Sequence, residues 1–140
     1  MSTIEVRRAT LDDVDFLISC ALKIASETEG KTLDVNFVRP GITHCIEDSS
    51  LGAYYVACRG EERLGTTMIT YEMSVAEGGQ IHWIQSVYVV AEARNQGVFR
   101  AIFDNIVAEA KKDPLVKGVR LYVDHDNDTA MAVYSKLGMS

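Results

Sequence analysis

The sequence predicts a mixed α/β fold, in which helices pack on one central sheet, for a single domain spanning residues 1–140. Three observations support this prediction. A length of 140 residues is enough for one sizeable hydrophobic core. Stretches rich in β-branched and aromatic residues alternate with stretches whose apolar residues recur at helical spacing. No internal repeat, linker or low-complexity tract divides the chain.

The first half of the chain predicts a strand, a helix and a hairpin. A strand over residues 3–10 leads into a helix that Thr10 opens, because Thr10 and Asp13 form a Thr-x-x-Asp capping pattern. Gly30 would end this helix. Residues 33–49 could form a second helix, although Arg39-Pro40-Gly41 interrupts its pattern. Two strands joined by a polar Gly-Glu-Glu-Arg turn then predict an antiparallel hairpin, over residues 53–60 and 63–75.

The second half predicts two strands that each lead into a helix. The glycine-containing turn around Gly97 separates the first strand from its helix, and Asp113-Pro114 stops that helix. The predicted elements are, in order, a strand over residues 81–90, a helix over 98–112, a strand over 118–124 and a helix over 127–139.

The charge and hydropathy of the chain exclude several classes of protein. A net charge of −6 argues against sequence-independent binding to nucleic acid or to an acidic membrane surface, and is compatible with a cationic small partner. No run of 18 apolar residues is present, and the first ten residues lack the apolar core of a signal peptide. A cytoplasmic protein that binds neither nucleic acid nor membrane is therefore expected.

Neither a disulfide framework nor a metal site is expected. The chain has three cysteines, Cys20, Cys45 and Cys58, which lie far apart in the sequence. Their odd number and wide spacing predict that they are buried as small hydrophobic residues. Asp124, Asp126 and Asp128 resemble the start of a calcium loop. The loop pattern fails, because Thr129 and Ser135 stand where glycine and glutamate are required.

The turn around Gly97 has the features of an anion site. The first backbone N–H groups of a helix have no intrahelical partner and lie at the positive end of the helix dipole. Gly97 lets a ligand approach the backbone closely, and Arg94 and Arg100 add positive charge that suits phosphate oxygens. A tight turn with solvated arginines explains the same residues equally well, so the loop alone leaves both interpretations open.

Two motifs together resemble those of the Gcn5-related N-acetyltransferase (GNAT) family. Residues 94–98 fit the pattern Gln/Arg-x-x-Gly-x-Gly/Ala up to its last position, with Val87 and Val89 on the strand before it. Asn127, Tyr134 and residues 137–139 resemble the second motif of the family. The resemblance extends from residue 3 to the end. It implies a mixed, mostly antiparallel central sheet flanked by helices, here lacking the last strand or strands.

The resemblance implies acetyl-CoA as a co-substrate and assigns residues to it. Pantetheine would pair with the backbone of Val87 and Val89, and the N–H near Val89 would polarise the thioester carbonyl. Asn127 would cap the last helix or contact the pantetheine arm, and Tyr134 would be the general acid for the departing thiolate. Arg94 and the following backbone amides would bind the pyrophosphate, namely those of Asn95, Gln96, Gly97, Val98, Phe99 and Arg100.

Three departures from the family pattern leave parts of the site open. Phe99 stands where glycine or alanine is usual. The chain stops at Ser140, so either a segment is missing or a partner chain covers the sheet edge, and a homodimer is expected. The base is unassigned, because the positions of a family glutamate fall on Trp83 or Gln85. A water relay ordered by Gln85 could take the place of the glutamate. His82 is the second, less favoured candidate for the base.

These inferences predict acetyl transfer from acetyl-CoA to a primary amine. The acceptor could be a polyamine, another small amine, an amino acid or a protein, and the acidic composition favours a cationic small molecule. The alternative is a non-catalytic CoA-binding sensor or regulatory module, which the absence of a carboxylate on the central strand supports. An unrelated α/β fold with an accidental loop would bind no CoA at all.

Overall fold

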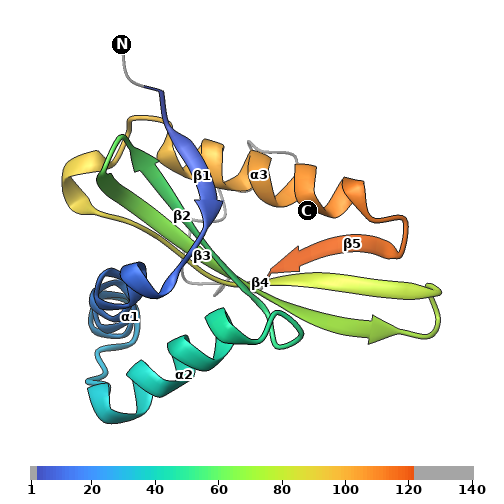
Figure 1. Cartoon of the computed structure of the whole chain (residues 1–140), viewed down its shortest axis with the longest axis horizontal. Coiled ribbons are helices and arrows are strands. Elements are labelled where there is room, and N and C mark those ends of the chain that lie inside the picture. The colour runs from blue at the N-terminus through green and yellow to red at the C-terminus, as the bar shows by residue number, and fades with distance from the viewer. Residues whose placement is uncertain (1–2, 122–140) are drawn as a thin grey trace.

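The computed structural model describes residues 3–121, which form a five-stranded sheet in the order β1-β2-β3-β4-β5 (Figure 1). The first four strands pair antiparallel and β5 pairs parallel to β4. The predicted mixed, mostly antiparallel sheet is therefore confirmed. The strands are β1 (Glu5–Arg8), β2 (Ala53–Arg59), β3 (Glu62–Ser74), β4 (Gly79–Val89) and β5 (Val116–Leu121).

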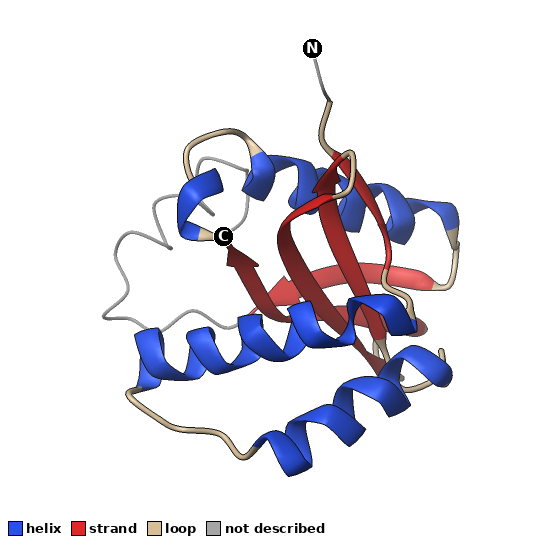
Figure 2. Ribbon diagram, turned by 60° about the vertical axis from the view of Figure 1, so that its left-hand side comes forward, coloured by secondary structure: helices blue, strands red, loops and turns tan. Residues whose placement is uncertain are grey.

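Helices cover both faces of the sheet (Figure 2). The helices α1 (Val14–Glu29) and α2 (Val35–Glu47) lie on one face, and α3 (Val98–Lys112) lies on the other. Short 3-10 turns precede α1 and follow β4, at Leu11–Asp13 and Ala91–Ala93. Within residues 3–121, no helix is long and apolar enough to cross a membrane. The predicted helix over residues 127–139 lies outside the described residues.

The second predicted helix forms and continues through Pro40, so the Arg39-Pro40-Gly41 segment does not interrupt it. The proline ring removes one backbone hydrogen bond from the helix interior. Other contacts hold the helix on both sides of that gap. Asp34 caps its start by accepting a hydrogen bond from the Asn36 N–H at 2.9 Å. Ile42 and Cys45, which follow the proline, are buried, and this burial offsets the lost hydrogen bond.

The alternation of side chains along the strands separates two apolar clusters. In β2, Tyr55 and Ala57 face α3, whereas Val56 and Cys58 face α1 and α2. The predicted burial of all three cysteines is confirmed, and none forms a disulfide. The α3 cluster includes Leu64, Ile69, Ile84, Val98, Ile102 and Ile106, and the opposite cluster includes Val14, Leu17, Ile18 and Ile42.

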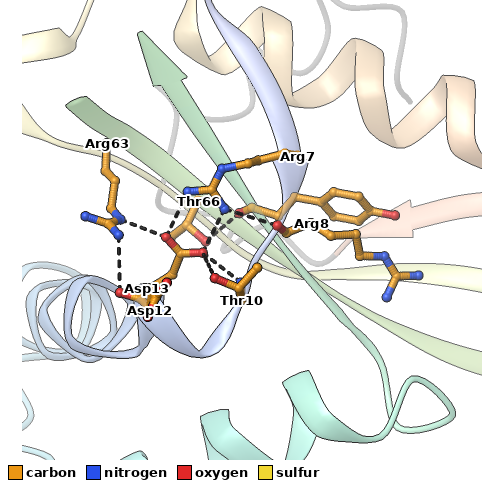
Figure 3. A network of polar contacts seen from close by, with 8 residues as sticks. Arg7, Arg8, Thr10, Asp12, Asp13, Arg63 and Thr66 are labelled. Carbon is orange, nitrogen blue, oxygen red and sulfur yellow. Dashed lines mark hydrogen bonds and ion pairs between the residues drawn. The ribbon is translucent and has the colours of Figure 1, made fainter. Parts of the chain in front are cut away.

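Asp13 joins three segments of the chain through its buried carboxylate (Figure 3). Its side chain is 0% exposed. The predicted capping contact is present, since the Thr10 N–H donates to Asp13 Oδ2 at 2.7 Å. Arg7 of β1 donates twice, at 2.7 and 2.9 Å, and Arg63 Nε of β3 donates at 2.7 Å. The pKa of the Asp13 carboxyl is held well below its ordinary value, chiefly by the Arg7 guanidinium.

Candidate functional site

The loop after β4 brings two left-handed residues to the start of α3. Asn95 has φ +66° and Gly97 has φ +86°, and Gly97 is the residue before the first helical turn. The first α-helical bond of α3 runs from the Ala101 N–H to the Gly97 carbonyl at 3.0 Å. The amides ahead of that bond point out of the helix end. A Cβ at Gly97 would meet no atom of residues 3–121 within 4 Å, so this part of the chain leaves the space over the loop open.

Gly65 of β3 allows α3 to start close to the sheet. A Cβ at this position would lie 2.7 Å from the Tyr88 carbonyl oxygen and 3.2 Å from Val98 Cγ1. Val98 is buried against the strands, whereas Phe99, the bulky departure from the motif, is half-buried on the helix surface. The first turn of α3 is thus anchored by Val98, which fixes the direction of its amides.

Cations surround the loop from two further elements. Arg100 lies on α3, exposed, with its Nε 3.2 Å from Asp104 Oδ1. Arg59, at the end of β2, donates from Nη1 to Gln96 Oε1 at 3.2 Å, and Gln96 Nε2 donates to the Glu92 carbonyl at 3.0 Å. Sequence reasoning missed Arg59, because only the pairing of strands brings it to a loop 37 residues away. Backbone amides at a helix start, with nearby arginines, fit the pyrophosphate of CoA.

The end of β4 presents backbone groups on the side away from β3. The Val90 N–H donates to the Leu64 carbonyl at 2.9 Å, so the groups of Val90 point towards β3. Because successive residues of a strand point their N–H and C=O to opposite edges, those of Val87 and Val89 point the other way. The described pairing of β4 with β5 ends at Ile84. This edge therefore suits the predicted pantetheine contact.

A β-bulge separates the part of β4 that pairs with both β3 and β5 from its last residues, whose described pairing is with β3. Met68 pairs with Ser86 and Ile69 pairs with Ile84, so Gln85 is the extra residue. Bulges bend a strand and increase its twist. The bulge therefore lies just before Val87, the first residue of the predicted pantetheine contact.

Arg94 does not point towards the helix start but turns back across β4. Its Nε donates to the Val89 carbonyl at 3.1 Å, and its Nη2 lies 3.6 Å from Glu27 Oε1 of α1. The Tyr88 hydroxyl donates to Glu27 Oε2 at 2.8 Å. Burial raises the pKa of the Tyr88 phenol, and the Glu27 carboxylate adds to this effect. Sequence reasoning missed Glu27, which is 61 residues from its tyrosine partner.

A family model described as "Acetyltransferase (GNAT) family" matches residues 21–139. The chain belongs to this family. It is 38% identical to a possible acetyltransferase from Clostridium difficile 630, with a TM-score of 0.91 over 97% of this chain and 90% of that one. The GNAT resemblance and the fold that it implied are confirmed. No curated protein sequence matches the chain.

Other solved structures share the GNAT fold at lower identity. A probable acetyltransferase is 23% identical, with a TM-score of 0.86 over 97% of this chain and 89% of that one. An aminoglycoside acetyltransferase from an uncultured soil metagenomic sample is 13% identical, with a TM-score of 0.77 over 95% of this chain and 86% of that one. At these identities the likeness concerns the fold alone.

Of the residues considered for the base of this GNAT member, His82 lies far from the loop. Its ring packs against that of Tyr71 at a tilt of 51°, with ring centroids 4.9 Å apart, and burial lowers its pKa. It precedes Val87 by five residues, or roughly 16 Å of extended strand. Gln85 Nε2 donates to Thr70 Oγ1 at 2.7 Å, and the Trp83 indole donates to Glu72.

Two predicted site residues of the GNAT member, Asn127 and Tyr134, lie outside the described residues. Among residues 3–121, no group of three or more His, Cys, Asp or Glu side chains is arranged to hold a metal ion. That the protein uses no metal stays a prediction.

Proposed function

We propose that this GNAT-family protein transfers the acetyl group of acetyl-CoA directly to a primary amine of a small molecule. The observation that carries the proposal is the junction of β4 and α3. There the loop that contains Gly97, a residue with a left-handed backbone conformation, adjoins the end of β4. The backbone groups of Val87 and Val89 on that strand point away from β3. The first feature suits a pyrophosphate and the second suits the amide-bearing pantetheine arm.

Each group of the junction has a separate task. The amides at the start of α3 bind the pyrophosphate, with charge from Arg59 and Arg100. Val87 and Val89 hold the pantetheine arm through their backbone, while their side chains pack in the α3 cluster. When bound, acetyl-CoA supplies a thioester whose carbonyl carbon accepts an amine. The Val89 N–H stabilises charge on that carbonyl oxygen.

Three proton transfers accompany the reaction, two from the acceptor nitrogen and one to the sulfur. An alkyl ammonium has a pKa of about 10.4, so only about one acceptor molecule in 2,500 is neutral at pH 7. The acceptor nitrogen must therefore give up one proton before attack, and it gives up a second as the amide forms. Since the sulfur takes up one proton, each turnover releases one proton to solvent. As the C–N bond forms and the C–S bond breaks, the thiolate takes a proton, for which we assign Tyr134. A phenol with a pKa of about 10 matches a thiol leaving group.

A cationic small molecule is the acceptor class that the charges favour. The net charge of the chain is −6, and the carboxylate of Glu27 lies beside the end of β4. Both would attract an ammonium group. Assembly as a homodimer and a cytoplasmic location stay predictions.

Calorimetric titration with acetyl-CoA, followed by a free-thiol assay on a panel of primary amines, tests the proposal. Micromolar binding together with amine-dependent thiol release would support an N-acetyltransferase. Binding without thiol release from any polyamine, monoamine or amino acid would instead favour a CoA-binding sensor. If acetyl-CoA did not bind, the proposed function would be wrong.

Replacing Tyr134 by phenylalanine should lower kcat by about 100-fold, the lower range for general acid catalysis, and change acetyl-CoA affinity by less than about twofold. Steady-state kinetics and calorimetry measure the two quantities. Tyr71→Phe is the matched control, since the Tyr71 ring packs against His82 away from the loop. Wild-type turnover in Tyr134→Phe would mean that another group protonates the thiolate.

A further inference from the structure

Side chains from three elements meet beside the end of β4. Glu27 comes from the last turn of α1, Tyr88 from β4 and Arg94 from the loop before α3. The Tyr88 hydroxyl donates to Glu27 Oε2 at 2.8 Å, and Arg94 Nη2 lies 3.6 Å from Glu27 Oε1. The Arg94 guanidinium carbon also lies 5.5 Å from the centroid of the Tyr88 ring. A carboxylate and an aromatic face thus hold one cation between them.

The guanidinium of Arg94 reaches from this carboxylate to the strand edge. Its Nε donates to the Val89 carbonyl at 3.1 Å, while its Nη2 faces Glu27. One small planar group therefore spans the distance between Glu27 and the backbone of Val89. A cation in this position lies next to the edge that is assigned above to the pantetheine arm. An amine held there would be close to the thioester that it must attack.

We propose that Glu27 and Tyr88 form the subsite for the ammonium group of the acceptor, and that Arg94 occupies this subsite until acetyl-CoA binds. The inference rests on the proposed function, because it names the place where the acceptor of that reaction is held. The ligand class is a primary ammonium. Glu27 supplies the opposite charge, and Tyr88 supplies the aromatic face and orients the carboxylate through its hydroxyl.

Binding of acetyl-CoA would take one contact from Arg94 and offer it a stronger partner. The Val89 carbonyl that accepts from Arg94 Nε is the group that a pantetheine amide would use. The pyrophosphate at the start of α3 offers Arg94 stronger, charge-assisted hydrogen bonds. The ion pair that it leaves is weak, since the Arg94 and Glu27 side chains are 47% and 48% exposed. Acetyl-CoA is therefore expected to bind first and the amine second.

Glu27→Gln tests the subsite, because it removes the charge and keeps the shape. At saturating acetyl-CoA, the KM for the best amine of the panel should rise at least tenfold. The affinity for acetyl-CoA should stay the same or increase, since Arg94 is released from Glu27. Glu29→Gln is the matched control, because Glu29 lies on the same last turn of α1 and, among residues 3–121, forms an ion pair with Lys31 alone, at 3.6 Å. A thermal melt of each variant checks the fold.

The order of binding has its own readout, which is calorimetric titration of the wild type with the same amine in the presence and absence of CoA. The amine should bind at least tenfold more tightly to the CoA complex. Equal affinity in both states would overturn the role of Arg94.

The outcomes separate this inference from the proposed function. A wild type that released thiol, with an unchanged amine KM in Glu27→Gln, would overturn the subsite and leave the acetyltransferase proposal intact. A wild type that bound no acetyl-CoA, or released no thiol with any amine, would overturn both. An equal rise of KM in Glu29→Gln would show a general effect of charge and also overturn the subsite.

Discussion

Gly97→Glu is expected to weaken acetyl-CoA binding by at least about 100-fold, or about 2.7 kcal/mol. The new carboxylate would stand in the space over the loop, where a Cβ meets no atom of the described residues within 4 Å. It would repel the pyrophosphate, and it would cover the amides at the start of α3 that are assigned to that group. Isothermal calorimetry with acetyl-CoA measures the effect directly.

The backbone strain of this substitution needs a separate control. Gly97 has φ +86°, where a residue with a side chain costs roughly 1–2 kcal/mol of folding free energy. Gly78 has φ +78° with equally open surroundings, in the turn between β3 and β4. Gly78→Glu should therefore cost the same stability and leave acetyl-CoA affinity unchanged. Wild-type affinity in Gly97→Glu would place the pyrophosphate elsewhere.

Asp13→Asn should lower the free energy of unfolding at pH 7 by about 3 kcal/mol, and the melting temperature by roughly 10 °C. The carboxylate is 0% exposed and accepts hydrogen bonds from Arg7, Arg63 and the Thr10 N–H. The loss should stay at the lower end of the range for a broken buried pair, because both arginines reach water. Asp12→Asn, one residue earlier and exposed, should cost much less.

The difference in free energy of unfolding between the wild type and Asp13→Asn should depend on pH, because it follows from the pKa of Asp13. Arg7 above all holds the folded-state pKa well below the ordinary value of 3.8. A depressed pKa gives stability that is complete above the unfolded value and is lost as the pH falls below it. The difference in free energy of unfolding between the wild type and Asp13→Asn, measured by urea denaturation, should therefore decrease from pH 7 to pH 3. A difference that stayed constant would mean that the carboxylate charge does not contribute.

Local patterns predicted most of the secondary structure. The Thr10 and Asp13 capping pattern, the glycine at the end of α1 and the bounds of α3 all depend on neighbours within one or two turns. Pro40 was misleading, because a missing backbone hydrogen bond is visible in the sequence, whereas the burial of Ile42 and Cys45 that offsets it is not.

Only the part of the candidate site that depends on neighbouring residues could be predicted from the sequence. The Gly97 loop could be predicted, because a strand, a turn and a helix start follow one another in the sequence. Arg59 and Glu27 could not, since they reach the site from 37 and 61 residues away through the sheet and through α1. The turning of Arg94 towards Glu27 depends on that same long-range packing.

Because all three cysteines are buried, the folded chain shields its thiols from reagents in solution. Burial also raises the pKa of Cys20 to about 12 and raises that of Cys45, which suppresses the reactive thiolate. A thiol reagent should therefore report released CoA while the protein is native. On unfolding, the three thiols become accessible together, so brief labelling at each denaturant concentration would count unfolded molecules. The chain thus carries its own chemical reporter of global opening, without an added dye or tag.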